Sequence, residues 1–418
     1  MVPSWPGRAT WRRWPVRGHL KISVFSRPAR AVLIADRLND LPLRIGDFLD
    51  LDMAVECFCA PEVLLGFDLV TAQLVAPGWS CPVEAAACDQ DMDLLIARFV
   101  GELAERIALS SYLPFVVART SERELRSGGH RVFDVRSFIG EPLLHSGWPF
   151  RPYDPAADID WTVGTDIETG SAVYVPAGLC SAQVRGWCEL TSNGTAAGAT
   201  AATATDRAIR ELFERDAIRL AWLMRVALAP VSPPSTWERV QKADEGLGWR
   251  TGFYHLASRG GAPVWVVFTR HQSIPIFAIG SACAAGSEAG LNHALQECLQ
   301  IRLKMWLSRA DTKAAAITEV RSFEDHILYY CNEIRLNDVE NLFRCDRRIN
   351  RARQVGPEVT LAGAVSMTIG HFLDLDVVRV LHPGLQPIEA DHGSARLIGS
   401  IGAARATADF RTTPVPFA

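Results

Sequence analysis

The sequence contains no uncharged apolar run close to the roughly 18 residues that a membrane-spanning helix needs. Its first apolar stretch, residues 22–25, is also shorter than the about 7–15 apolar residues of a secretory signal peptide. The two absences argue against a membrane helix and against an export signal. We therefore expect a cytoplasmic protein.

Common metal and nucleophile motifs are also missing. Ten cysteines are present, but no two have the C-x-x-C spacing of a structural zinc site. The ten histidines form neither an H-x-H nor an H-E-x-x-H pattern, and no serine elbow occurs. Without an export signal the cysteines are predicted to be reduced, and Cys298 is predicted to pack rather than to attack a substrate. With these motifs missing, the class of chemistry that remains is one based on a metal ion and phosphate groups.

Charge is nearly balanced over the whole chain but not at its start. The net charge of −4 predicts no general attraction to nucleic acid or to an anionic membrane. The first thirty residues carry seven basic side chains and no acid. We expect residues 1–30 to be a flexible basic arm, residues 31–65 a lead-in, and residues 66–418 the functional domain.

The remaining pattern mixes strands and helices. With 418 residues, of which 48% are apolar, the chain can bury a large core. Hydrophobic periodicity predicts three long helices, at residues 91–110, 203–226 and 287–308. β-branched runs bounded by turn residues predict strands at residues 67–75, 113–118, 131–134, 172–176 and 377–381, and a hairpin of residues 249–256 and 263–269. These elements predict a mixed α/β fold.

One short pattern occurs twice, on two of the predicted helices. Residues 102–106 read E-L-A-E-R, and residues 211–215 read E-L-F-E-R. Glutamates three apart share a helix face, with about 5–6 Å between their Cβ atoms, and repel each other unless a cation lies between them. The arginine near that face suits phosphate oxygens. Two such helices facing each other would form a magnesium–nucleotide site, whereas the alternative is two surface helices with ordinary Glu–Arg pairs.

The residues around the second copy carry a resemblance. Ser192-Asn193-Gly194 and Ala196-Ala197-Gly198 precede it, and Asp216-Ala217 and then Trp222 follow it. The set resembles the signature of the YcaO superfamily, whose members use ATP to activate backbone amides of peptides. Residues 161–177, 280–302 and 377–385 resemble other segments of the family in the same order. The resemblance covers residues 66–418.

The resemblance implies a YcaO-type α/β fold in which the duplicated helix motif faces a shared nucleotide cavity, with ATP and Mg²⁺ as cofactors. In azoline-forming members a side-chain thiol or hydroxyl of the peptide attacks the preceding amide carbonyl. The resulting oxygen takes the γ-phosphoryl group of ATP, and phosphate leaves as the azoline forms. Catalysis is then mainly positioning and electrostatics.

The matching positions imply a role for each site residue. The implied metal ligands are Glu102, Glu105, Glu211 and Glu214. The implied nucleotide and phosphate contacts are Arg106, Ser192, Asn193, Gly194, Gly198, Arg215, Gln300 and Arg302. The implied catalytic residues are Arg215, Glu297, Gln300 and the terminal Ala418.

Three positions depart from the family pattern. Ala199 and Thr203 stand where the family often has an asparagine and an acid. Residues 88–91 stand where some members have a Gly-Lys-Gly segment. Partner-dependent members, which resemble the D component of thiazole/oxazole peptide synthetases, also lack that lysine. The tail, residues 414–418, keeps two of the three prolines of the family's P-x-P-x-P ending and is expected to reach the catalytic cavity.

The resemblance therefore implies an ATP-dependent cyclodehydratase acting on Cys, Ser or Thr of a ribosomally made precursor peptide, in bacteriocin or other natural-product biosynthesis. No leader-binding winged helix or ubiquitin-activating-like segment is recognised, so a separate leader-binding partner is expected. A flavin dehydrogenase is a further candidate partner, and a homodimer is expected. The alternatives are thioamide or amidine formation, or a noncatalytic scaffold motivated by Ala199 and Thr203.

Overall fold

The computed structural model describes residues 10–13, 21–25, 37–38, 52–58, 64–75, 83–144, 148–181, 186–232, 235–308, 317–344, 356–403 and 409–417. Its strands and helices are grouped into three larger sheets, one two-stranded sheet and the helices that pack on them.

The first sheet has the order β1-β2-β3-β4-β5. Its strands are β1 (Thr10–Arg13), β2 (Lys21–Phe25), β3 (Asp52–Phe58), β4 (Asp68–Val75) and β5 (Val83–Asp89). Two of them, β1 and β2, come from residues 1–30; they pair with each other, and β2 also pairs with β3. The boundary expected at residue 66 falls inside this sheet, because β3 pairs with β4 along its whole length.

Helix α4 (Met92–Ser111) joins the first sheet to the second. Asp91 caps it, because its carboxylate accepts hydrogen bonds from the backbone N–H groups of Asp93 and Leu94. Leu95, Phe99 and the apolar residues further along the same face pack on the first sheet, and burial of each large side chain stabilises the fold by about 1.5–3 kcal/mol. Ala104 and Ala108 are also fully buried but belong to the core of the second sheet.

The second sheet has the order β10-β16-β15-β8-β6, with β9 paired to β8. Its strands are β6 (Ala118–Thr120), β8 (Ile159–Asp166), β9 (Ala172–Pro176), β10 (Thr195–Gly198), β15 (Val365–Phe372) and β16 (Leu375–Leu381). The turn before β10 needs a glycine, since Gly194 has φ +74° and a Cβ there would lie 2.5 Å from the carbonyl oxygen of Val380. Helix α7 (Ala201–Leu223) follows β10 directly, and Thr200 caps it through the N–H of Thr203.

The third sheet is an antiparallel set of four strands in the order β11-β12-β13-β14. Its strands are β11 (Ala229–Pro230), β12 (Trp249–Ala257), β13 (Pro263–His271) and β14 (Phe277–Cys283), and helices α8 (Ser235–Gly246) and α9 (Ser287–Ser308) flank it. Gly280 lets α9 lie directly on β14, because a Cβ at this position would be 2.0 Å from the carbonyl oxygen of Ala294.

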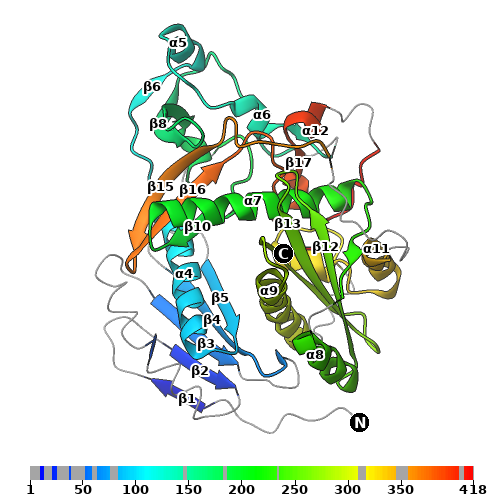
Figure 1. Ribbon diagram of the computed structural model, residues 1–418. Coiled ribbons are helices and arrows are strands. Elements are labelled where there is room, and N and C mark those ends of the chain that lie inside the picture. Colours follow the sequence, from blue (N-terminus) through cyan, green and yellow to red (C-terminus); the bar gives the residue numbers. More distant parts are fainter. Residues whose placement is uncertain are drawn as a thin grey trace.

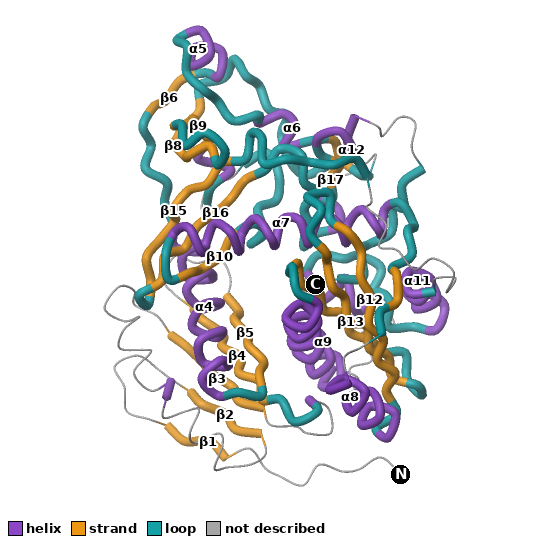
Figure 2. The backbone as a smooth tube through the Cα atoms, in the orientation of Figure 1, coloured by secondary structure: helices purple, strands orange, loops and turns teal. Residues whose placement is uncertain are grey.

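The remaining elements are short. They are helices α5 (Glu122–Ser127), α6 (Val135–Ile139), α10 (Phe323–Leu328), α11 (Glu333–Phe343) and α12 (Gly399–Ala403), and the two-stranded sheet of β7 (Glu141–Pro142) and β17 (Arg396–Leu397). Figure 2 shows that the region around α5, β6, β8 and α6 consists mainly of loops and short strands.

The three long helices connect the three larger sheets. Helix α4 packs on β5, β10 and β15, helix α7 on β10, β16 and β14, and helix α9 on β14, β13 and β5. Figure 1 shows α7 crossing the middle of the molecule, with α4 and α9 below it in that view. Each long helix therefore bridges two sheets.

The predicted mixed α/β class and the three predicted long helices are confirmed within two or three residues. The predicted hairpin is also present, as β12 and β13. The predicted strand at residues 113–118 is wrong for most of its length, because only its last residue enters β6 while Leu113 and Phe115 are 72% and 79% exposed. Residues 131–134 make only an isolated bridge, between Val132 and Tyr174. No helix in the described part of the chain has the length and apolar character needed to cross a membrane.

Candidate functional site

The first copy of the repeated motif lies on α4. Glu102 and Arg106 form an ion pair with each other, at 2.6 Å, one helical turn apart. Glu105 accepts a hydrogen bond of 2.7 Å from the backbone N–H of Ala197 on β10. The helix thus presents one self-paired Glu–Arg couple and one carboxylate anchored to the second sheet.

The second copy lies on α7 and is held by more partners. Glu211 accepts from the N–H of Gly194 at 3.1 Å. Glu214, which is 6% exposed, accepts from the hydroxyl of Ser281 at 2.7 Å and from the N–H of Cys283 at 3.1 Å. Arg215 lies 3.7 Å from Glu211 and 3.8 Å from Glu214, beyond ordinary hydrogen-bond distance of either.

The third helix, α9, adds a further carboxylate. Glu297 accepts from the N–H of Ser281 at 3.2 Å and lies 3.7 Å from the imidazole of His293, one turn earlier. Gln300 is half-buried. Arg302 does not belong to this group, because it is fully buried, pairs with Asp244 at 2.8 Å and lies over the ring of Trp249. The nucleotide contact implied for Arg302 stays a prediction, whereas the contacts it makes in the structure are this buried ion pair and the ring of Trp249.

Electrostatics shows that the three helices meet. Burial and then the charge of Glu102 raise the pKa of Glu105 well above its ordinary range, with Glu211 on the other helix adding to the effect. Burial raises the pKa of Glu211 to about 7, although Arg215 opposes the shift. Burial and the charge of Glu214 raise the pKa of Glu297 to about 8. Carboxylates from α4, α7 and α9 therefore repel one another across shared space.

The two arginines compensate this negative charge. The carboxylate of Glu102 raises the pKa of Arg106. Burial alone would lower the pKa of Arg215, but the carboxylates of Glu214 and Glu297 outweigh it and raise that pKa. The two arginines remain partly accessible, with 18% of the Arg215 side chain and 34% of the Arg106 side chain exposed. A ligand can therefore reach them.

The cluster fits Mg²⁺ together with phosphate better than a cage made of protein alone. Among the residues that the structure describes, no group of three or more His, Cys, Asp or Glu side chains is placed to hold one metal ion. Mg²⁺ commonly keeps several waters and binds to one or two carboxylates plus the phosphates of its substrate. Mutually repelling carboxylates and a loosely paired Arg215 supply those two kinds of partner.

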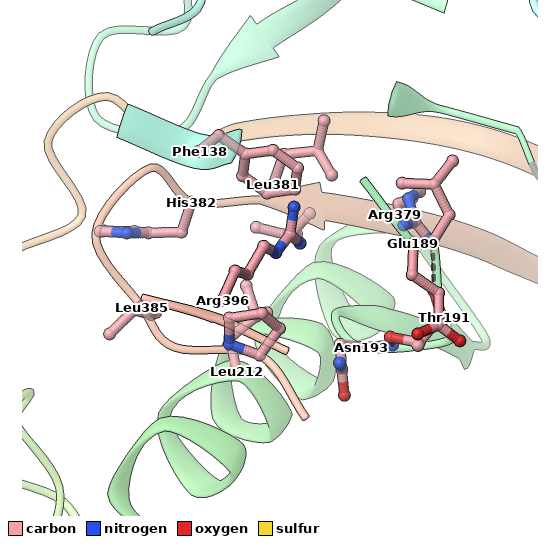
Figure 3. A pocket seen from close by; sticks show the side chains of 13 residues that line it. Phe138, Glu189, Thr191, Asn193, Leu212, Arg379, Leu381, His382, Leu385 and Arg396 are labelled. Atoms are coloured by element: carbon pink, nitrogen blue, oxygen red, sulfur yellow. Dashed lines mark hydrogen bonds between the residues drawn. The ribbon is translucent and has the colours of Figure 1, made fainter. Parts of the chain in front are cut away.

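The residues predicted around the nucleotide are only partly brought into the cluster. Gly194 contributes through its N–H, which holds Glu211. Asn193 instead donates to the carbonyl oxygen of Ile388 and lines the separate pocket drawn in Figure 3. Ser192 is half-buried, and Gly198 packs against the backbone of Ala204. These residues form the turn and the strand that lead into α7.

Three contributors were not predicted from the sequence. Ser281 on β14 bridges Glu214 and Glu297. His293 precedes Glu297 by four residues. This spacing places both side chains on one helix face, so His293 could have been predicted from the sequence. Arg98, one turn before Glu102, pairs at 3.0 Å with the buried Asp89. No sequence pattern indicated Ser281, because its role depends on how α9 and α7 pack against β14.

The C-terminal tail is buried. Val415 and Phe417 are 0% and 2% exposed and belong to the core around α7. Tyr330 donates to the carbonyl oxygen of Pro414, and a ring nitrogen of His326 lies 2.8 Å from that of Val415. Ala418, for which the resemblance implies a catalytic role, lies outside the described residues.

Comparison with known proteins identifies the family. Residues 96–386 match the model of the YcaO cyclodehydratase family, which is described as ATP- and Mg²⁺-binding. ATP and Mg²⁺ are thus the cofactors of the family. No curated protein matches the chain.

Solved structures with the same fold share few identical residues with this chain. A heterocyclase in complex with substrate and cofactor has a TM-score of 0.60 at 15% identity, over 83% of this chain and 53% of its own. The chain therefore spans about half the length of that heterocyclase.

Two other structures match over nearly their full length. YcaO from Methanopyrus kandleri, bound with AMPPCP and Mg²⁺, has a TM-score of 0.56 at 17% identity, over 92% of this chain and 97% of its own. The E. coli microcin synthetase McbBCD complex with pro-MccB17 bound gives 0.59 at 13% identity, over 88% and 96%. Such low identities show the fold alone. Together with the family match, which covers more than half of the sequence, they confirm the prediction: the chain belongs to the YcaO family.

Proposed function

We propose that this protein is an ATP- and Mg²⁺-dependent cyclodehydratase that converts Cys, Ser or Thr of a ribosomally made precursor peptide to azolines. Three observations in a member of the YcaO family carry the proposal. Arg215 lies near Glu211 and Glu214 on α7, and Ser281 links Glu214 to Glu297 on α9. The charges of Glu297 on α9 and Glu102 on α4 also help to raise the pKa of Arg215.

Helix α7 would supply fixed carboxylates for the cation and an arginine for the phosphate groups. The carboxylates of Glu211 and Glu214 are fixed by donors from β14 and from the turn before β10. Fixed carboxylates hold a hard cation without reorganising, which favours catalysis by preorganised charge. Arg215 is not fully engaged by either glutamate and would neutralise charge on phosphate oxygens.

When bound, Mg-ATP would supply the phosphoryl group that turns an amide oxygen into a leaving group. Glu105 and Glu297 have raised pKa values and would bind the cation in their deprotonated forms. Glu102 is paired with Arg106 and would exchange that partner for the cation on loading.

The partners belong to the proposal as well. The substrate would be a precursor peptide, and a leader-binding protein of the ubiquitin-activating-like type would deliver it, since tethering raises the effective concentration of the reacting segment. The neighbouring microcin synthetase structure is a complex of several proteins, with pro-MccB17 bound, and supports a multi-protein assembly. A flavin dehydrogenase acting on the azoline, and a homodimer of this chain, complete the proposal.

The test uses the full chain with a leader-binding protein and a leader-bearing precursor peptide sought among the genes next to its own, together with ATP and Mg²⁺. Wild-type protein should release phosphate and remove one water per cyclised residue, and both should stop in EDTA. Glu102→Gln should abolish turnover, whereas Glu288→Gln, an exposed acid at the start of α9, should not. Phosphate release at the wild-type rate by Glu102→Gln would contradict the proposal.

A second candidate is a noncatalytic scaffold, favoured by one observation. Ala199 and Thr203 are both exposed at the start of α7, where family members often carry an asparagine and an acid. Failure of the complete mixture to hydrolyse ATP, with a stable complex to the partner still formed, would support the scaffold. Thioamide formation would appear as ATP use with sulfide and replacement of one peptide oxygen by sulfur. Amidine formation would appear as ATP use with loss of water and a new C–N bond to an amine in place of an azoline ring.

A further inference from the structure

A second pocket lies behind the turn that holds Glu211 and is distinct from the carboxylate cluster. It lies between the turn before β10, the end of β16 and the 385–396 segment, and it is partly open to solvent. Its lining includes Arg379, Arg396, Glu189, Asn193 and Phe138, and Figure 3 shows both guanidiniums among these side chains.

Arg379 is a buried cation without a carboxylate partner. It is 2% exposed, and its hydrogen bonds go to two neutral acceptors, the carbonyl oxygen of Thr191 at 3.0 Å and the hydroxyl of Thr195 at 3.1 Å. No ion pair to a described residue compensates its charge, and its Nε has no hydrogen-bond partner among those residues. A buried charge left in this state is costly.

Arg396 is also short of acceptors. It is 2% exposed and pairs with Glu389 at 3.2 Å, while its Nη1 has no partner in the described part of the chain. Glu389 is itself shared, because the buried Arg219 lies 3.9 Å from its other oxygen. One carboxylate therefore faces two guanidiniums.

The two lining guanidiniums also repel each other. Burial lowers the pKa of Arg379, and the charge of Arg396 adds to that decrease. Glu189 is the acid among the lining residues. It accepts from the backbone N–H of Asp391 at 3.1 Å, and burial raises its pKa to about 7.

We propose that this pocket binds a small oxyanion, with Arg379 and Arg396 as its charged ligands. Guanidinium forks match the oxygens of phosphate and of carboxylate alike, so the shared chemistry is an oxyanion with at least two accepting oxygens. Inorganic phosphate and a peptide carboxylate are the two sources of such a group. The site is separate from the proposed nucleotide site, whose arginines are Arg106 and Arg215.

The experiment measures the thermal midpoint of the full chain at constant ionic strength in chloride, phosphate or acetate, with a saturating nonhydrolysable ATP analogue and Mg²⁺ present. Phosphate should raise the midpoint by about 1–3 °C over chloride. Arg379→Gln should lose this increment and Arg215→Gln should keep it. An equal increment with acetate assigns the pocket to a carboxylate, and a larger one with phosphate assigns it to phosphate.

Two results would overturn the proposal. One is a phosphate increment lost in Arg215→Gln and kept in Arg379→Gln, because the anion would then bind in the nucleotide site. The other is the absence of any increment over chloride, because water alone would then satisfy the guanidiniums. Crystals of the wild-type protein soaked in selenate give an independent measurement if Arg379→Gln does not fold: an anomalous peak between Arg379 and Arg396 is expected, and its absence rejects the site.

Discussion

The two copies of the repeated motif have nearly the same sequence but different surroundings. On α4, Arg106 forms an ion pair with Glu102 at 2.6 Å. On α7, Arg215 stays 3.7 Å or more from both glutamates of its copy. Arg215 therefore has donors left for a ligand, and Arg106 has fewer.

The third residue of the motif also differs between the copies, since it is Ala104 on α4 and Phe213 on α7. Ala104 is fully buried between α4 and the second sheet, and the adjacent Glu105 bonds to Ala197 of that sheet. Phe213 is 8% exposed and lies against Gly260, where an added Cβ would be 2.6 Å from its ring. The same local pattern thus acquires different roles, because each copy packs against a different sheet.

Among the tests of the contrast between the two copies, the largest expected effect concerns the arginines. Arg215→Gln should lower peptide-dependent ATP turnover roughly 10²–10³-fold, because donors positioned for phosphate charge are lost. Arg106→Gln should lower it only about tenfold, since Arg106 already neutralises Glu102. Arg210→Gln, on the exposed face of α7, is the matched control and should leave turnover unchanged. Equal losses for Arg215→Gln and Arg106→Gln would remove the distinction between the copies.

The second prediction concerns the longer C-terminal part of α7, which continues past its motif to Leu223. There Trp222 donates to the carbonyl oxygen of Thr413, and Arg411 lies over its ring. Deleting residues 414–418 should reduce the free energy of unfolding by about 3 kcal/mol or more, because Val415 and Phe417 leave the core. The measurement is a denaturant or thermal unfolding curve.

Deleting Ala418 alone separates packing from catalysis. That variant keeps Val415 and Phe417, so its thermal midpoint should match the wild type, and the implied catalytic role predicts slower cyclisation. Cyclisation at the full rate would show that the tail is only a packing element.

The third prediction compares anchored carboxylates. Glu214 uses both oxygens as acceptors from Ser281 and Cys283, whereas Glu102 bonds only to Arg106. A glutamine at position 214 could accept from Cys283 and donate to the hydroxyl oxygen of Ser281, but both bonds would lose their charge assistance, so Glu214→Gln should cost about 1–3 kcal/mol of stability. Glu102→Gln should cost less than about 1 kcal/mol. Equal unfolding midpoints for the two variants would show that the anchoring of Glu214 has no energetic weight.

The sequence predicted the helices and the motif better than it predicted their connections. Hydrophobic periodicity located α4, and the repeated motif indicated the glutamates that α4 and α7 contribute to the cluster. Ser281 could not be found, because its position beside Glu214 depends on β14 pairing in the third sheet. The ion pair of Arg302 with Asp244 could not be found either, because only the packing of α9 brings the two side chains together. Local patterns give the helix face, whereas the choice between cavity and core is made by distant segments.

The smallest expected effect is the pH dependence of the metal-free protein. The folded-state pKa of Glu211 is raised to about 7 and that of Glu297 to about 8, above the ordinary value of 4.5. The folded protein thus binds more protons than the unfolded chain between about pH 4.5 and 8, and its stability falls as pH rises through that range. In EDTA the thermal midpoint should fall by about 1–3 °C from pH 5.5 to 8, after allowance for other groups.

Two comparisons sharpen this pH test. Saturating Mg²⁺ with a nonhydrolysable ATP analogue should remove most of the decrease, because the cation stabilises the deprotonated carboxylates. Glu211→Gln should flatten the metal-free curve, since its side chain does not titrate, while Glu288→Gln should keep the wild-type slope because Glu288 is exposed. A wild-type curve in EDTA that is as flat as that of Glu211→Gln would show that the carboxylates of α7 and α9 do not share one electrostatic site. The contrast between the two copies would then rest on hydrogen bonding alone.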